Sequence, residues 1–167
     1  MANAPQNGTQ PPVNEGPANQ QAQVRVIGQF IKDLSFENPS IGRVQIEPNE
    51  QPNIRIEVNV NAQNMGPNVY ESVIELKAHC SAKAGVLYEL EIEYGALLQL
   101  EHIPEASLEP FLLINCPALT FPFVRRLVAD ITREGGFPPL LLDPIDFANL
   151  YLQRRQQAGQ GVANPVA

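Results

Sequence analysis

Regular alternation of apolar and polar residues in the first half of the chain limits the folds that it can adopt. The segment from Ile54 to Asn61 (IRIEVNVN) alternates without a break, so an extended strand there has one apolar face and one polar face. The segment from Leu87 to Tyr94 (LYELEIEY) alternates in the same way, with glutamates along its polar face. Its apolar face consists of Tyr88, Leu90, Ile92 and Tyr94. Both segments predict strands that are buried on one side.

Two further segments complete a predicted sheet. Gln23 to Phe36 alternates imperfectly, and Gly28 within it predicts a bulge. Its end places Leu34 and Phe36 on one face, with the polar residues Asp33, Ser35 and Glu37 on the other. The segment from Val69 to Cys80 again alternates. Four successive strands predict an antiparallel sheet.

The spacing of apolar residues changes to that of helices in the second half. Residues 104–115 are apolar enough for a short helix, which Pro117 is expected to end. From Phe121 onward the apolar residues form a helical stripe, and Gly135 and Gly136 follow as its stop. The stripe consists of Phe123, Val124, Leu127, Val128 and Ile131. Strands followed by helices predict an α+β fold, a four-stranded antiparallel sheet followed by C-terminal helices.

The stretch from Phe137 to Leu152 (FPPLLLDPIDFANLYL) joins a stiff apolar connector to a last helix. Its two consecutive prolines exclude helix from the connector, which must therefore run extended against something apolar. A surface that binds other polypeptides is one alternative. Asp143 can cap the helix, Pro144 suits its first position, and Asp146 suits the dipole. The apolar residues of the connector are Phe137, Leu140, Leu141 and Leu142.

Composition separates one folded body from two polar ends. Residues 1–22 have too few apolar side chains to offset the entropy lost on ordering and are expected to form a disordered tail. Residues 158–167 are expected to form a flexible C-terminal tail, which leaves a single domain at 23–157. The N-terminus lacks the basic and apolar regions of a signal peptide, and no later run is expected to approach a membrane span.

Charge and cysteine content exclude further classes. A net charge of −7 disfavours nucleic acid and anionic membrane surfaces as partners and favours basic ones. Cys80 and Cys116 are the only cysteines and stand far apart, so they offer neither a disulfide framework nor metal-ligand spacing. These features predict a cytoplasmic protein in a reducing compartment, without direct membrane insertion.

Residue pairs that suggest chemistry have simpler explanations. His79 and Cys80 are neighbours on a strand and therefore point to opposite faces. Cys116 has no base placed by the sequence to activate it, and the glutamates from 89 to 93 are typical of a solvated face. No phosphate-binding loop, nucleophile elbow or HExxH motif is present. We expect no enzyme activity, no cofactor and no metal site.

Several motifs, taken in order, resemble one family. IKDLSFENP (Ile31 to Pro39), NVYE (Asn68 to Glu71), CPALTFPFVRRLV with its CP and FP dipeptides, and GGFPPLLLDPIDFANLY are closely similar to the SecB protein-export chaperones. The similarity runs from about Val24 to Gln157. It implies an ATP-independent cytosolic holdase that binds unfolded precursor polypeptides and delivers them to the SecA motor ATPase. It also implies a homotetramer built as a dimer of dimers.

The resemblance also implies roles for particular residues. Asp33, Glu37 and Glu91 match the acidic face that docks the motor. The oligomer and client-binding region of the family is matched by Tyr88, Leu90, Ile92 and Tyr94. The loop over the client groove is matched by Phe137, Leu140 and Leu142. For each of these apolar residues, ordinary core packing is an equally good interpretation.

The sequence departs from the family pattern in two places, and two alternative functions also fit it. Glu89 stands where family members can carry an apolar residue, and the connector after Pro39 is longer than usual and lacks tryptophan. The second reading of the chain is an assembly subunit whose apolar connector is buried permanently against one partner. A small hydrolase is third. The sequence does not distinguish general export from a dedicated toxin system.

Overall fold

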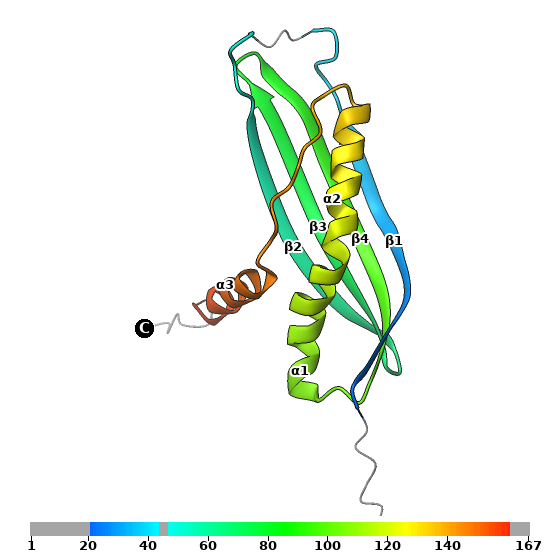
Figure 1. The fold of residues 1–167 in the computed structure, drawn as a ribbon. Coiled ribbons are helices and arrows are strands. Elements are labelled where there is room, and N and C mark those ends of the chain that lie inside the picture. Colours follow the sequence, from blue (N-terminus) through cyan, green and yellow to red (C-terminus); the bar gives the residue numbers. More distant parts are fainter. Residues whose placement is uncertain (1–20, 44–46, 161–167) are drawn as a thin grey trace, which may run out of the picture.

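A single antiparallel sheet forms the framework of the protein (Figure 1). The computed structural model describes residues 21–43 and 47–160. The strands are β1 (Gln23–Glu37), β2 (Asn53–Gly66), β3 (Val69–Ala82) and β4 (Gly85–Glu101). They pair in the order β1-β4-β3-β2, so β1 and β2 are the two edges. The prediction of a four-stranded antiparallel sheet followed by helices is confirmed.

A long helical segment covers one face of this sheet (Figure 1). It consists of α1 (Glu105–Pro110), a π-helical stretch (Phe111–Asn115) and α2 (Cys116–Glu134) without a break. The expectation that Pro117 ends a short helix is therefore wrong. The backbone N–H of Cys116 bonds to the carbonyl of Phe111, five residues earlier, and this wider turn lets the chain accommodate the proline.

The wider turn leaves a buried carbonyl that the sheet satisfies. In a regular α-helix the carbonyl of Leu112 would accept the N–H of Cys116. Here the Ser72 hydroxyl on β3 donates to Leu112 O at 2.8 Å. The helical irregularity is thus matched by a polar side chain from a distant part of the sequence.

The continuous helix Glu105–Glu134 is also long and apolar enough, by length and composition, to cross a membrane. A helix that ended at Pro117 would be too short to cross a membrane. Because the helix continues, the expectation that no run approaches a membrane span is wrong by length and composition. Its apolar content has a use within the fold, because Phe121, Val124 and Val128 pack into the main core against the sheet. Of the predicted stripe, Phe123 is the exception and is 43% exposed.

The main core lies between this helix and the sheet. Its centre is formed by fully buried side chains of β3, β4 and α2: Ile74, Leu76, Leu90, Ile92, Val124 and Val128. Burial of each of these side chains contributes roughly 1.5–3 kcal/mol of transfer free energy. Since all the strand residues among them come from the predicted apolar faces, alternation identified the buried side of the sheet correctly.

The last helix, α3 (Phe147–Gln160), follows an extended connector that crosses the sheet diagonally (Figure 1). The predicted start at Pro144 with Asp143 as cap is wrong, because Asp146 Oδ1 accepts the backbone N–H of Asn149 at 2.9 Å. The predicted tail from residue 158 begins inside α3, which continues to Gln160. The predicted tail at 1–22 lies outside the described residues except for positions 21 and 22, which have no regular structure.

Strand β1 contains two bulges. The register with β4 shifts between Val26 and Gly28, as Gly28 predicted, and shifts again between Ile31 and Asp33. Each shift gives β1 one extra residue, Ile27 in the first and Lys32 in the second. The second bulge lies directly before the acidic end of the strand.

Candidate functional site

The sheet face that points away from the helices, called the open face here, carries the predicted motor-binding residues. Asp33 lies opposite Glu93, Glu37 lies opposite Glu89, and Glu91 lies opposite Ser35. All three predicted residues therefore stand on neighbouring strands β1 and β4 and on one side of the sheet. The structure brings together residues that are up to 58 positions apart in the sequence (91 − 33).

Like charges face one another across this surface. Glu93 lies between Asp33 on β1 and Glu75 on β3, with each neighbour directly opposite it. Directly opposed like charges destabilise an antiparallel sheet. A row of this kind costs folding free energy, and it produces a concentrated negative potential that attracts basic partners.

An exposed ion pair partly neutralises the open face, and an exposed histidine contacts a second glutamate there. Lys77 Nζ lies 3.2 Å from Glu91 Oε1, and His79 Nδ1 lies 2.9 Å from Glu89 Oε1. Pairs as exposed as these contribute roughly 0–1 kcal/mol and are screened by salt. A basic partner can therefore displace Lys77 from Glu91 at small cost.

A third pair on the open face is different because one partner is buried. Lys32 Nζ lies 2.9 Å from Glu71 Oε2, and the Glu71 side chain is only 7% exposed. Gln63 Nε2 donates to the same oxygen at 2.5 Å. The hydrogen bond from Lys32 lowers the pKa of Glu71 below its ordinary value, against the effect of burial. The same bond raises the pKa of Lys32.

The predicted client-binding residues of β4 lie in the core of the single chain. Their exposed fractions are 2% for Tyr88, 0% for Leu90, 1% for Ile92 and 8% for Tyr94. They face the helical layer, not the open face. The alternative of ordinary core packing therefore describes their surroundings in the single chain, and client contact stays a prediction that requires this layer to open.

The connector presents its three leucines in alternating directions, as an extended backbone must. Leu140 and Leu142 are buried in the main core, whereas Leu141 between them is 76% exposed. Phe137 is half-buried against Tyr88, with their ring centroids 4.8 Å apart. Among the predicted connector residues, none is as accessible as Leu141.

A buried hydroxyl holds the connector on α2. Thr132 is fully buried, and its Oγ1 accepts the backbone N–H of Leu140 at 2.9 Å. The same hydroxyl donates to Val128 O at 2.9 Å. Thr132 thus satisfies a backbone donor that the extended connector would otherwise bury without a partner.

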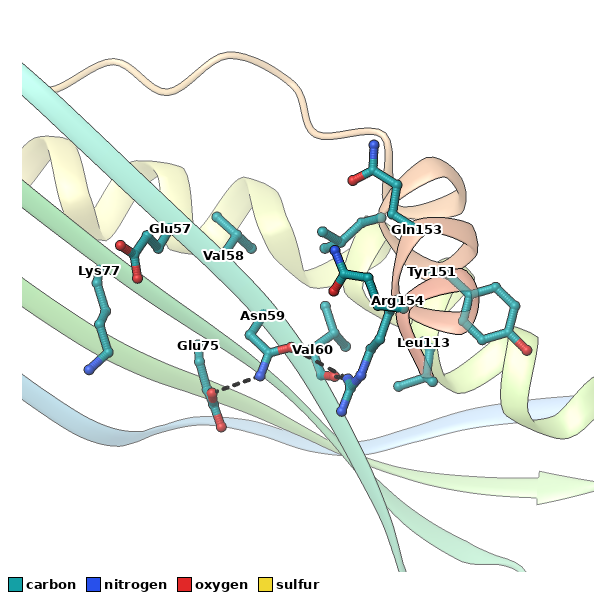
Figure 2. Close-up of a pocket in the computed structure, with 12 residues that line it drawn as sticks. Glu57, Val58, Asn59, Val60, Glu75, Lys77, Leu113, Tyr151, Gln153 and Arg154 are labelled. Carbon is teal, nitrogen blue, oxygen red and sulfur yellow. Dashed lines mark hydrogen bonds between the residues drawn. The ribbon is translucent and has the colours of Figure 1, made fainter. Parts of the chain in front are cut away.

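A groove of about 500 Å³ runs between edge strand β2 and α3 (Figure 2). Arg154 on α3 reaches across it and donates to the backbone carbonyl of Val60 at 2.5 Å and to Asn59 Oδ1 at 3.4 Å. Asn59 in turn donates to Glu75 Oε2 at 3.2 Å. Figure 2 shows this chain of contacts from α3 through β2 to β3.

Sequence reasoning missed the contact of Arg154 with β2. The sequence suggests that the last helix ends near Arg154, where a cation suits the helix dipole, but that interpretation is wrong, because α3 continues to Gln160 and has no basic residue in its last turn. The unpaired carbonyl of an edge strand is not visible in a sequence, because it depends on the order of strands in the sheet. The signal that could have found it is the polar face of β2, which offers Asn59 and Asn61 as acceptors.

The remaining chemistry-bearing residues lie apart from one another. Cys80 and Cys116 are free and buried, and burial raises the pKa of both thiols. His79 lies on the open face and Cys80 on the helical side, as predicted. Within residues 21–43 and 47–160, no group of three or more histidine, cysteine or acidic residues is placed to hold a metal ion.

Apolar side chains are left exposed on the helical side of the molecule and on its edge. Strand β1 exposes Val24, Val26, Ile31 and Leu34, each by 41–45%. Helix α2 exposes Leu119 and Phe123. Exposed apolar side chains along an edge strand are typical of an interaction surface.

The sequence matches one protein family over most of its length. The family model described as "SecB: Preprotein translocase subunit SecB" matches residues 17–158. The protein-export protein SecB of Azorhizobium caulinodans is 42% identical over 159 residues, which cover 95% of this chain and 96% of that protein. The protein-export protein SecB of Hyphomonas neptunium is 45% identical over 154 residues, 92% of this chain and 91% of that protein.

A solved structure has the same fold. It is a SecB-like chaperone from Mycobacterium tuberculosis, in complex with a peptide from an antitoxin. The TM-score is 0.60 at 17% identity, and the match covers 74% of this chain and 90% of that one. At this level of identity the likeness concerns the fold.

Proposed function

Because this chain belongs to the SecB family and is a chaperone for preprotein export, we propose that it acts as an ATP-independent holdase that delivers unfolded precursors to the SecA motor. The observation that carries the proposal is the difference in chemistry between the two faces of one sheet. The open face is acidic, whereas the helical side and the connector supply apolar groups.

Motor docking is assigned to Asp33, Glu37 and Glu91. These carboxylates are exposed and share the open face, so a basic surface can approach all three at once. Charges of this kind govern encounter and orientation more than burial does. We therefore expect docking to weaken as salt concentration rises.

Client binding is assigned to the connector and the layer beneath it. Leu141 is the first connector side chain that an unfolded polypeptide can meet. The other assigned residues, Tyr88, Leu90, Ile92, Tyr94, Phe137, Leu140 and Leu142, become available only where the connector or α2 moves away from the sheet. Several weak apolar contacts held at once give affinity without sequence specificity.

The working form is assigned as a homotetramer, a dimer of dimers, in the cytoplasm. The exposed apolar residues of β1 and α2 support this assignment, because a monomer would leave them in contact with water. Light scattering at micromolar concentration measures the mass. A monomer would contradict the assignment, and a dimer would support only half of it.

Suppression of aggregation tests holdase activity directly. The full-length protein is added without nucleotide to an unrelated polypeptide diluted from denaturant, and light scattering follows aggregation. A holdase delays aggregation in proportion to its concentration. An assembly subunit with one dedicated partner leaves the aggregation curve unchanged, and that result would remove the general holdase from consideration.

A further inference from the structure

The second bulge of β1 determines which side of the sheet carries the acidic residues. Ile31 pairs with Tyr94 and Asp33 pairs with Glu93, so Lys32 is an extra residue between two consecutive pairs. In a regular strand successive side chains alternate between faces. If the same residues continued from Ile31 as a regular strand, with Lys32 on the open face and no bulge, Asp33 and Glu37 would point toward the helices, and Phe36 would point to the open face.

The bulge also places two adjacent residues of opposite charge on the same face. Asp33 lies opposite Glu93 on the open face, and Lys32 reaches Glu71 on that face at 2.9 Å. Adjacent residues of an unbulged strand cannot do this. Lys32 thus supplies a cation beside the row of Asp33, Glu93 and Glu75 carboxylates.

The Lys32–Glu71 pair spans the sheet from its edge. Lys32 is on edge strand β1 and Glu71 is on β3, with β4 between them. The Glu71 carboxylate is buried, and Gln63 of β2 donates to the same oxygen as Lys32 does. One end of the pair is therefore rigid, and it can hold the bulged residue in place.

We propose that Lys32 and Glu71 are positioning residues for motor docking, whose ion pair holds the bulge that presents Asp33 and Glu37 on the open face. The inference rests on the proposed docking role of these two acids. Neither Lys32 nor Glu71 needs to touch the motor. Their contribution is the geometry of the neighbouring strand segment.

Substitution of Lys32 separates this role from simple electrostatics. Lys32→Met removes a positive charge from an acidic face, so Coulomb attraction alone predicts tighter binding of a basic motor surface. The positioning role predicts weaker binding, by roughly 3- to 30-fold. Binding of purified SecA to the full-length protein is measured at low salt.

Lys77→Met is the matched control. Lys77 is a cation on the same face, but its pair with Glu91 is exposed at both ends. Its removal frees Glu91 and is expected to leave motor affinity unchanged or to increase it. Equal or tighter binding of Lys32→Met relative to the parent would overturn the proposal.

Amide hydrogen exchange of residues 31–37 tests the same role without the motor. Exchange is expected to rise in Lys32→Met and in Glu71→Gln and to stay at the parental level in Lys77→Met. The double variant Lys32→Met/Glu71→Gln is expected to regain stability relative to Lys32→Met, because no unpaired buried carboxylate remains. Unchanged exchange in both single variants would contradict the proposal.

Failure of the docking assignment gives a different pattern. If Asp33→Lys, Glu37→Lys and Glu91→Lys all bind the motor as the parent does, the open face is not the docking surface. The exchange data then decide alone whether Lys32 and Glu71 hold the bulge. The two hypotheses therefore fail on different measurements.

Discussion

The ring of Phe137 lies 4.8 Å from the ring of Tyr88, and this contact fixes the start of the connector to the first part of β4. The ring of Phe36 lies 5.7 Å from the same Tyr88 ring. Phe36 precedes Glu37 on β1, so one aromatic cluster joins the connector to the strand that carries the proposed docking acids. The cluster places the two proposed surfaces back to back across the sheet.

Replacing Phe137 by alanine is expected to lower the free energy of unfolding by about 1–3 kcal/mol. A half-buried phenylalanine loses part of the 3–5 kcal/mol typical of a fully buried one. Phe137→Leu, the control, keeps the apolar contact and loses only the ring interaction of about 0.5–1.5 kcal/mol. Denaturant unfolding measures both, and an alanine variant as stable as the parent would mean that the ring contact contributes nothing.

Removing the Thr132 hydroxyl is expected to loosen the connector. Thr132→Val keeps the shape of the side chain but leaves the Leu140 N–H without its acceptor in a buried position. A buried unsatisfied group costs about 1–3 kcal/mol. Thr132→Ser retains the hydroxyl and should stay closer to the parent. Equal stability of the valine and serine variants in thermal unfolding would argue against this anchor.

The leucines of the connector should separate stability from client binding. Leu141→Ser changes an exposed residue and is expected to weaken client affinity with thermal stability and oligomeric mass preserved. Leu140→Ser changes a buried residue and is expected to cost about 2–5 kcal/mol of stability. Parental client affinity in a stable Leu141→Ser variant would remove this side chain from the client surface.

Charge reversal on the open face should affect the motor and not the client. Each of Asp33→Lys, Glu37→Lys and Glu91→Lys is expected to slow association with SecA at low salt, because rim charges act mainly on encounter. Glu134→Lys, on an exposed residue at the end of α2, is the control and should bind as the parent does. Loss of client binding in the same variants would indicate a damaged fold.

The stability contributed by Glu71 should disappear in acid. Its pKa is lower in the folded protein than its ordinary value of 4.5, first because Lys32 donates a hydrogen bond to it. A carboxyl of this kind stabilises the fold fully above its unfolded pKa, and the contribution is lost as pH falls through the folded pKa. The stability difference between the parent and Glu71→Gln should therefore be present at neutral pH and shrink below about pH 4.5. A difference that stays constant into strong acid would contradict the ion pair.

Local patterns predicted those parts of the fold that depend on neighbouring residues. Alternation placed Asp33 and Glu37 opposite Leu34 and Phe36, and the structure agrees. It also placed Glu91 away from Leu90. A strand has a period of two residues whatever it packs against, so its faces can be assigned from the sequence.

Features that depend on distant residues could not be predicted in this way. Pro117 is typical of a helix end, but a wider helical turn before it lets the helix continue. The Ser72 hydroxyl donates to the carbonyl of Leu112, which this turn leaves free. The sequence predicts Asp143 as the cap of the last helix, but Asp146 caps it, because the connector stays extended as far as Ile145, which packs against the core.

The sequence by itself therefore determined the secondary structure classes, the acidic face and the family, since all three follow from residue order. Only the tertiary structure decided that Leu140 and Leu142 are covered while Leu141 is exposed, and that Lys32 shares a face with Asp33. The physical reason is that burial and bulges depend on which strand or helix lies alongside. A local period carries no information about the partner against which a residue packs.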